Sequence, residues 1–399
     1  MRVLQNANIA TLRGPSGARA ADAAGDVGFL RGTIAMDNGR IVFVGPDEDW
    51  GGPAGEDLQG ALVTPGFVDS HTHLVYGGDR AFEMALKLQG RSYMEILEAG
   101  GGIAYTTEKT RSASIQELVE QALPRLRRMI SAGTTTIEMK SGYCLETEGE
   151  LKILQAGALL ARETDVLASH TFLGAHAVPA GTDAAAYTQL VTDEMLPAAK
   201  EQGIAEACDV FVEEGVFTAE QGETILQAAR ALGFWTKIHA DEIVNTEGAQ
   251  LAASCGCRSA DHLLRVSPEG IAAMAKAGTI ATLMPTVPIT LMSPEWAPGK
   301  ALLAAGVPVA LATDHNPNNP VTDMGLVAQL GCSLLGLSPA QALTAVTWNG
   351  ACALGLESEV GSLEVGKRAN VLIHDVHDLD HWVYELGRST VREVLLGSA

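Results

Sequence analysis

Apolar runs of strand length alternate with amphipathic stretches through the middle of the chain. Helical spacing of apolar positions fills the intervals, as at 115–130, 151–162, 219–232 and 268–277. Eight strand-like runs lie at 62–69, 134–139, 166–172, 207–212, 235–240, 259–263, 279–284 and 307–314. Repeated β-α alternation predicts an α/β fold, a (β/α)8 TIM barrel. A doubly wound open sheet is the alternative.

Both ends of the chain carry another pattern, of short strands separated by turns. The N-terminal part predicts strands at 3–4, 8–10, 32–36 and 40–45, and the last forty residues predict them at 361–363, 366–369, 370–375 and 391–396. Asn38-Gly39 separates two of these runs, which is a strong hairpin signal. We predict a small, discontinuous β-sandwich domain from residues 1–60 and 357–399, with the barrel in residues 61–356.

Composition narrows the function classes. The 399 residues include 27 Lys and Arg against 48 Asp and Glu, a net charge of −21, which argues against nucleic acid and anionic membranes as partners. A hydrophobic content of 47% excludes a disordered chain. Six cysteines are too few for a disulfide scaffold, and Cys255-Gly256-Cys257 lacks a second pair for a metal clip. With no signal peptide and no apolar membrane span in view, we expect a cytoplasmic protein.

Polar residues end several of the predicted strands. In a barrel these C-terminal ends meet on one face, where active sites form. Asp314 closes the last run, His239 closes the fifth with Glu242 three residues on, and Asp261-His262 closes the sixth. His71 and His73, at i and i+2, follow the first. Taken singly, His239 is a core residue and Asp314 a helix cap, but together His71, His73, His239 and Asp314 predict a mononuclear site for zinc or iron.

Several sequence blocks carry a family resemblance. The segments 65–73 (PGFVDSHTH) and 366–370 (GKRAN) resemble the amidohydrolase superfamily, and the resemblance spans the chain. Within it, seven blocks in order resemble the imidazolonepropionase family: 75–80, 100–103, 138–143, 171–177, 237–242, 259–263 and 312–314.

The resemblance implies an activity and roles for residues. That family opens the ring of 4-imidazolone-5-propanoate with water, giving N-formimidoyl-L-glutamate in histidine degradation. It implies one metal ion, Zn²⁺ or Fe, on the four ligands named above, and catalysis by Glu242, His262 and Asp314. The implied substrate contacts are Arg80, Tyr143, His176, Asn316 and Asn318. A guanidinium suits the propanoate tail because it binds a carboxylate with two parallel hydrogen bonds.

Some positions depart from the family or leave alternatives open. The loop 315–320 is one residue shorter than usual, and Cys144 stands where glycine is common. An alternative is that Lys140 is a carbamylated bridging ligand, as in binuclear members of the superfamily, but its block resembles the imidazolonepropionase version, in which the lysine is not a ligand. No role is predicted for His170, His315, His374, His377 and His381.

Two other functions compete with the ring-opening hydrolase. One is a deaminase of a purine-like or pyrimidine-like ring, which would share the metal ligands and release ammonia. The other is a non-catalytic barrel that binds a metal or a small ligand, and the presence of every implied ligand argues against it. The expected partners are a small molecule with a carboxylate tail and a second copy of the chain in a homodimer.

Overall fold

Eight parallel strands form the centre of the molecule, as predicted. The computed structural model describes residues 1–14, 16–91, 95 and 100–397. Each strand pairs with the next one along the chain, with register shifts between β6 and β7 and between β8 and β9, so the sheet order follows the chain. The strands are β6 (Phe67–Asp69), β7 (Thr134–Lys140), β8 (Leu167–Ala175), β9 (Ala207–Val212), β10 (Trp235–Ala240), β11 (Ser259–His262), β12 (Ile280–Leu283) and β13 (Val309–Leu311).

The two end strands of this sheet, β6 and β13, meet just beyond their C-terminal ends. The amide of Asp314 donates to the carbonyl of His71 at 3.0 Å, and the amide of His73 donates to the carbonyl of His315 at 2.8 Å. The Asp69 carboxylate accepts hydrogen bonds from the amide and hydroxyl of Thr313, at 3.0 and 2.7 Å. The sheet therefore closes into a barrel, and the open-sheet alternative is wrong.

Helix α15 (Trp348–Leu354) covers the seam between the same two strands. Asn349 donates from Nδ2 to the carbonyl of Val309 in β13 at 2.8 Å. A Cβ on Gly350 would lie 2.8 Å from the carbonyl oxygen of Val68 in β6. The helix thus occupies the place where a ladder between β6 and β13 would otherwise continue, and glycine permits its close approach.

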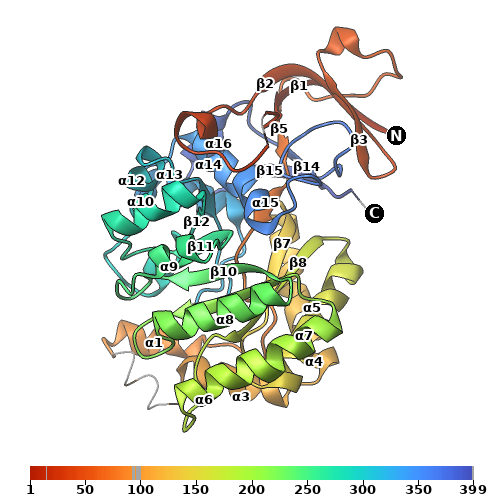
Figure 1. The fold of residues 1–399 in the computed structure, drawn as a ribbon. Helices are drawn as coiled ribbons and strands as arrows, with labels where there is room; N and C mark the ends of the chain where they lie inside the picture. The colour runs from red at the N-terminus through yellow and green to blue at the C-terminus, as the bar shows by residue number, and fades with distance from the viewer. Residues whose placement is uncertain (15, 92–94, 96–99, 398–399) are drawn as a thin grey trace.

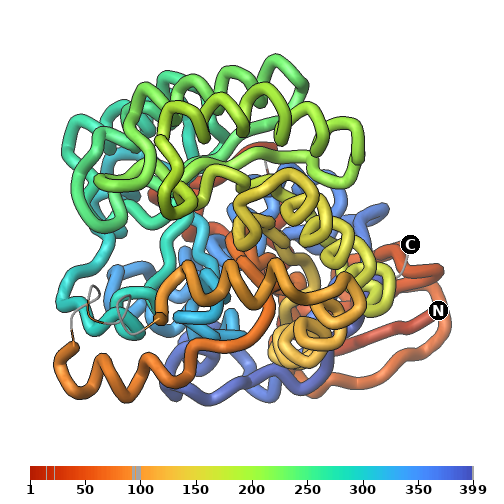
Figure 2. Tube along the Cα trace, turned by 90° about the horizontal axis from the view of Figure 1, so that it is seen from below, coloured from red at the N-terminus to blue at the C-terminus, as the bar shows by residue number. Residues whose placement is uncertain are grey.

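Helices surround the barrel (Figure 1) and enclose it when seen from below (Figure 2). Predicted helix starts coincide with capping boxes, Ser114 with Glu117 and Thr218 with Gln221. The remaining helices are α1 (Phe82–Leu88), α3 (Gly102–Ser112), α4 (Ile115–Ser131), α5 (Thr147–Thr164), α6 (Ala184–Leu190), α7 (Leu196–Gln202), α8 (Ala219–Ala231), α9 (Gly248–Ser254), α10 (Pro268–Ala277), α11 (Val287–Thr290), α12 (Gly299–Ala304), α13 (Met324–Leu335), α14 (Pro339–Val346) and α16 (Leu379–Tyr384). Short helical turns are η1 (Ala21–Gly25), η2 (Asp47–Asp49) and η3 (Val191–Met195).

Segments from both termini form a second, mixed sheet of seven strands at one end of the barrel (Figure 1). The two chain ends consequently lie near each other (Figures 1 and 2). Asn38 and Gly39 have φ angles of 46° and 72°, as the hairpin prediction requires. The strands are β1 (Arg2–Ala10), β2 (Phe29–Asp37), β3 (Arg40–Gly45), β4 (Glu56–Asp57), β5 (Leu62–Pro65), β14 (Val371–His374) and β15 (Val391–Leu395).

Three strand predictions need correction. The run 62–69 is not one barrel strand: β5 pairs with β1 and β14 in the terminal sheet, and only β6 belongs to the barrel. The chain changes sheets at Gly66, where a Cβ would meet the Thr135 hydroxyl at 2.1 Å. The predicted strands at 361–363 and 366–369 are turns and irregular backbone, with a single bridge from Arg368 to Arg40.

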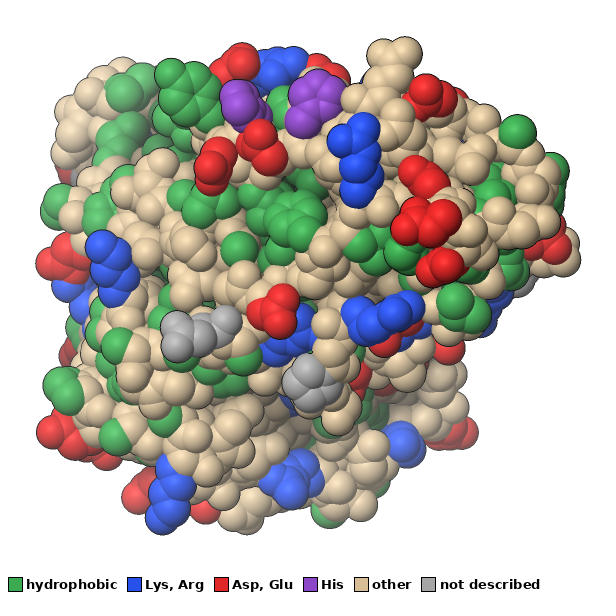
Figure 3. Space-filling view, turned by 90° about the horizontal axis from the view of Figure 1, so that it is seen from above, with side chains coloured by type: hydrophobic (Ala, Val, Ile, Leu, Met, Phe, Trp, Pro, Cys, Tyr) green, Lys and Arg blue, Asp and Glu red, His purple; other side chains and the backbone are tan. Residues whose placement is uncertain are grey.

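Surface and cysteine features agree with the composition. Figure 3 shows acidic side chains spread over one face of the molecule, with basic side chains between them. Among the described residues, no helix has both the length and the apolar content needed to cross a membrane. All six cysteines are free, and burial raises the pKa of the Cys257 thiol to about 12.

Candidate functional site

The C-terminal mouth of the barrel holds a cavity of about 350 Å³. Nearly every residue that the sequence assigned to the site lines it; His71 lies beneath, fully buried. The lining side chains are His73, Arg80, Ile103, Tyr143, His176, Phe211, His239, Glu242, Ile243, His262, Leu291, Asp314, Asn316 and Asn318.

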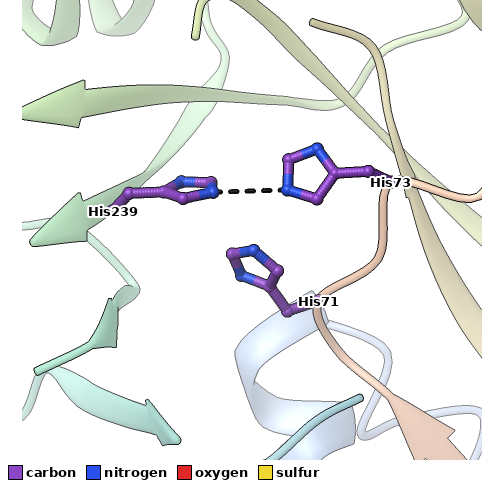
Figure 4. A group of neighbouring side chains, drawn as sticks. All are labelled: His71, His73 and His239. Carbon is purple, nitrogen blue, oxygen red and sulfur yellow. Dashed lines mark hydrogen bonds between the residues drawn. The ribbon is translucent and has the colours of Figure 1, made fainter. Parts of the chain in front are cut away.

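Three imidazole rings converge on one side of this cavity. His71 and His73 extend from the segment after β6, and His239 extends from the end of β10 (Figure 4). The Nε2 atoms of His73 and His239 are 3.4 Å apart. One nitrogen from each of the three rings can be chosen so that the three atoms all lie within 4.8 Å of one another. Two nitrogens bound to one tetrahedral zinc at about 2.0–2.1 Å would lie about 3.4 Å apart. The spacing is that of ligands to a shared ion.

Asp314 adds a carboxylate to the three rings. Its Oδ1 lies 3.7 Å from Nε2 of His71 and 3.6 Å from Nε2 of His73. This buried oxygen has no hydrogen-bond partner among the described residues, and neither does His71 Nε2. Burial lowers the pKa of both His71 and His73 well below the usual range, which leaves their lone pairs available. Lone pairs aimed at one another repel unless a cation lies between them, so these four residues fit a metal ion.

Two carboxylates hold the outer sides of the rings. Asp261 Oδ2 lies 2.6 Å from Nδ1 of His71, and Asp209 Oδ2 lies 3.0 Å from Nδ1 of His239. Each contact places the Nδ1 proton on the carboxylate side and points Nε2 into the site. Carboxylate–histidine pairs of this kind fix ring orientation and increase ligand basicity in metal sites.

Two lysines lie behind these carboxylates, in the centre of the barrel. Lys140 Nζ is 2.6 Å from Asp209 and 3.0 Å from Glu138, and Lys237 Nζ is 3.0 Å from Glu138 and 3.4 Å from Asp261. All five side chains are fully buried. Burial opposes the charge on Lys140, but Asp209, Glu138 and Asp261 outweigh it and raise its pKa above the usual value. An ammonium group is not the nucleophile that carbamylation needs, which agrees with the prediction that Lys140 is not a metal ligand.

His262 and Glu242 face the cavity beside the histidine cluster. His262 Nδ1 lies 3.6 Å from Glu242 Oε1, and neither ring nitrogen of His262 has a hydrogen-bond partner within the described part of the chain. Burial raises the pKa of Glu242 to about 7, helped by Glu213 and opposed by His239. His262 and Asp314 both have positive φ, 77° and 49°, which is uncommon for residues other than glycine and is found at functional sites.

His176 and Tyr143 form another wall. The His176 ring stacks on His73 with centroids 4.8 Å apart, and its Nδ1 lies 3.0 Å from the carbonyl oxygen of Gly142. Because a carbonyl only accepts, Nδ1 carries the proton. Burial lowers the pKa of His176 to about 3, so the ring is neutral and its Nε2 is an acceptor. Tyr143 is buried with its ring 5.3 Å from that of His176.

Arg80 also lines the cavity, and it comes from the segment that leads into α1 rather than from a barrel strand. Its Nε and Nη2 donate to the two carboxylate oxygens of Glu83, both at 2.7 Å. Glu83 is 1% exposed and also accepts from the amide of Gly102, at 2.7 Å. One edge of the guanidinium is thus occupied, and the edge formed by Nη1 and Nη2 is left for a ligand.

The shortened loop after β13 organises itself through asparagine side chains. Asn316 Oδ1 accepts from the amides of Asn318 and Asn319, at 2.8 and 3.0 Å, and its Nδ2 donates to the carbonyl of Asp314 at 2.9 Å. Asn319 Nδ2 donates to the carbonyl of Thr313 at 2.8 Å. The Asn316 side chain therefore shapes the loop, whereas Asn318 presents its amide group toward the cavity and Lys87.

Sequence reasoning gave no role to several residues that complete the site: Asp69, Glu83, Lys87, Glu138, Asp209, Lys237 and Asp261. The signal for most of them was present, since a charged residue inside a buried strand needs a partner. The unassigned histidines are not among the described residues that line the cavity. His315 directly follows Asp314, but its Nδ1 contacts the carbonyl of Val321 at 2.8 Å. His374 contacts the hydroxyls of Thr64 and Thr390, both at 3.0 Å, in the terminal sheet.

Proteins of similar sequence share most of the chain's length. The imidazolonepropionase of Alkaliphilus oremlandii is 44% identical over 93% of this chain and 90% of its own. The imidazolonepropionase of Geobacillus kaustophilus is 45% identical, again over 93% and 90%. The chain therefore groups with proteins of that name along nearly its whole length.

Solved structures share the fold at lower identity. The 5-methylcytosine deaminase of Klebsiella pneumoniae, liganded with 5-fluorocytosine, superposes with a TM-score of 0.75 at 18% identity, over 99% of this chain and 96% of its own. A zinc-bound adenosine deaminase of Xanthomonas campestris gives 0.70 at 20%, over 99% and 91%. The model of the amidohydrolase family matches residues 62–398, which include the histidine cluster and the cavity. The chain belongs to the amidohydrolase family, and within it to the imidazolonepropionases.

Proposed function

We propose that the chain opens the ring of 4-imidazolone-5-propanoate by hydrolysis, giving N-formimidoyl-L-glutamate. The observation that carries this proposal is the composition of one cavity, whose lining combines histidines of a metal-type cluster with Arg80. A cyclic amide with a carboxylate tail needs both a way to activate water and a cation for the tail.

The proposed cofactor is one ion, Zn²⁺ or Fe, held by His71, His73, His239 and Asp314. A metal ion in such a site lowers the pKa of water toward 7 and polarises a carbonyl group. Asp209 and Asp261 keep the Nε2 atoms of two ligands aimed at the ion. Histidine and carboxylate ligands suit both metals, and metal analysis of the purified protein distinguishes them.

Arg80 binds the propanoate in this proposal. Glu83 occupies the Nε–Nη2 edge, so the carboxylate is bound by the Nη1–Nη2 edge in a two-point contact. Glu83 also fixes the guanidinium plane, which reduces the entropy lost when the tail binds. Tyr143 lies close enough to line the same ligand space.

Proton handling is assigned to three groups. Water oxygen forms a bond to the ring carbonyl carbon, the carbon–nitrogen bond breaks, and one proton moves from water to the leaving nitrogen. Asp314 accepts the proton of the attacking water, and Glu242, with a pKa of about 7, delivers a proton to the leaving nitrogen near neutral pH. Transfer of the proton from Asp314 to Glu242 then restores both groups. His262 hydrogen-bonds the carbonyl oxygen as charge develops. His176, an acceptor at Nε2, receives a ring N–H rather than donating to the carbonyl or the tail.

One assay tests this function against the deaminase alternative. Metal-replete protein is incubated with 4-imidazolone-5-propanoate, and the ring chromophore and free ammonia are both followed. Loss of the chromophore without ammonia is the expected result. Unchanged substrate would exclude the proposed function, and ammonia release from a cytosine-like or purine-like substrate would favour the deaminase.

Assembly and location complete the proposal. We propose a homodimer in the cytoplasm, with the catalytic barrel and the terminal β domain as two structural units of each chain. The six free cysteines fit a reducing compartment. Light scattering of the purified protein measures the mass, and a value of one chain would contradict the dimer.

A further inference from the structure

We propose that Lys87 is a specificity-determining residue, which supplies the uncompensated positive charge that selects a singly charged carboxylate tail. The inference rests on the proposed function, because it names what distinguishes the tail-binding end of that substrate site. It starts from Arg80, the cation assigned to the tail. The charge of Arg80 is already matched by Glu83 through two 2.7 Å hydrogen bonds. The pair alone carries no net charge toward a ligand.

Lys87 lies beside this pair on the same helix face. Glu83 and Lys87 are at i and i+4 in α1, a spacing that places two side chains on one side of a helix. Lys87 is half-buried, and its pKa is lowered by burial and by Arg80 but raised by Glu83. Arg80, Glu83 and Lys87 therefore act as one group with two positive charges and one negative charge. The remaining positive charge matches one carboxylate.

The contacts of Lys87 connect this group to the cavity. Its Nζ donates to the carbonyl oxygen of Thr290 at 3.3 Å and to Oδ1 of Asn318, a residue of the cavity wall. An ammonium group only donates, so the amide oxygen of Asn318 must face Lys87. The Nδ2 group of Asn318 is then directed away from Lys87, where its hydrogens are available to an acceptor. Lys87 thus sets both the charge and the donor orientation at the tail end.

An unmatched charge of this kind has a specific consequence. Loss of the Lys87 charge should weaken the binding of a carboxylate tail but leave a neutral tail nearly unaffected. A structural link between α1 and the loop after β13 would instead affect both tails alike. The acid-to-amide ratio therefore separates the two roles.

The experiment measures the binding of imidazole-4-propanoate and of its neutral propanamide to the metal-loaded enzyme by calorimetry. Lys87→Met should raise the Kd of the acid about ten-fold and change that of the amide less than about two-fold, since the Lys87 charge acts on the tail from behind Asn318 and is lost only to a charged tail. Lys87→Arg should restore the preference for the acid. Lys276→Met, at an exposed position on α10, is the matched control and should change neither Kd.

The outcomes separate this proposal from the function on which it rests. Equal weakening of acid and amide, or no weakening in either Lys87→Met or Lys87→Gln, would overturn the role of Lys87 even if the wild-type enzyme hydrolyses imidazolone propanoate. Failure of the wild type to hydrolyse it would overturn the proposed function, whereas the ratio would still report the charge. Circular dichroism establishes that both variants are folded before binding is measured.

Discussion

The metal side and the tail side of the cavity are built in different ways. On the metal side, His239 lies near the end of β10, and its Nδ1 is 3.0 Å from Asp209 of the adjacent strand β9. Asp209 is in turn paired with Lys140 of β7, two strands away from β9. On the tail side, Lys87 belongs to α1, a helix of seven residues, and Arg80 belongs to the segment just before that helix. Their partners lie in other loops or one turn away. The side that activates water is fixed by the barrel, and the side that selects substrate is assembled from connections.

The two sides should therefore differ in how well they tolerate substitutions. A buried charge network tolerates few substitutions, because removing one partner leaves another charge unpaired in a low-dielectric interior. Loops and short helices change at lower cost to the fold. A family can therefore keep one chemistry while the tail side is exchanged to suit another substrate.

Loss of the metal ligands should produce the largest effect. His239→Ala, or chelation of the wild type, should abolish ring opening, because water at neutral pH is a weak nucleophile without a Lewis acid. Zn²⁺ or Fe should restore activity to the chelated wild type but not to the variant. Metal content by mass spectrometry and turnover are measured together. Full turnover by protein shown to be metal-free would contradict the mechanism.

Glu242→Gln should follow in size. Turnover should fall by about 10²-fold or more with metal content unchanged, since general acid–base groups contribute about 10²–10⁴. This variant tests whether metal binding and proton transfer depend on different residues of the metal side. Turnover near that of the wild type would remove Glu242 from the proton path.

Asp209→Asn tests the layer behind the ligands. The isosteric amide removes the charge that orients His239 and partly neutralises Lys140, so metal affinity should fall about 10–100-fold. Competition with a metal chelator provides the measurement. Asp193→Asn, an exposed aspartate, serves as the control. An unaltered affinity would mean that the strand alone orients the ring.

Arg80→Lys addresses the tail side. Lysine keeps the positive charge but lacks the planar guanidinium group that donates two parallel hydrogen bonds to a carboxylate. We therefore expect kcat/KM to fall about ten-fold. The metal content should be unchanged, which is the property that separates the two sides. If KM alone rises, the tail is held equally in the ground and transition states; a fall in kcat means that the tail also orients the ring. If the Arg80→Ala variant still prefers the substrate with a carboxylate tail over the analogue with a neutral amide tail, another residue binds the carboxylate.

The last effect is on stability, with no change expected in turnover, and it concerns a buried histidine outside the cavity. Burial lowers the pKa of His374 to about 3, so the unfolded chain binds a proton near pH 6.5 while the folded chain does not. The free energy of unfolding is therefore highest above pH 6.5 and decreases as the pH falls toward 3. At pH 5 the decrease due to His374 is about 2 kcal/mol. His374→Gln should unfold in urea with a smaller difference between pH 7.5 and pH 5 than the wild type. An identical difference would assign the acid sensitivity to other groups, His170 and His315 among them.

The sequence predicted the barrel and the ligand candidates for physical reasons. Buried parallel strands are continuous apolar runs, so their lengths and spacing can be read directly, and strand ends in a barrel share one face. His71, His73, His239 and Asp314 could therefore be grouped from their positions along the chain. Periodicity could not divide the run 62–69, because β5 and β6 are both buried and equally apolar.

Pairing was the part that the sequence could not provide. Asp209 is adjacent to His239 only because β9 pairs with β10, and Asp261 reaches His71 only because the barrel closes, since β11 and β6 are not neighbouring strands. The 315–320 loop likewise gave no indication that the Asn316 side chain is used within the loop. Predictions of residue type at a strand end are thus more secure than predictions of what each side chain contacts.

The position of the barrel seam has a consequence for the metal ion. His71 and His73 follow the first strand and Asp314 follows the last, and backbone hydrogen bonds join the same two segments. An ion bound by all three would link His71 to Asp314, which lies 243 residues further along the chain. Cross-links over long loops restrict the unfolded chain most. Metal binding would therefore hold together the segments that follow the first and the last strand of the barrel. We expect the backbone amide hydrogens of His73 and Asp314 to exchange with solvent more slowly in the metal-loaded protein.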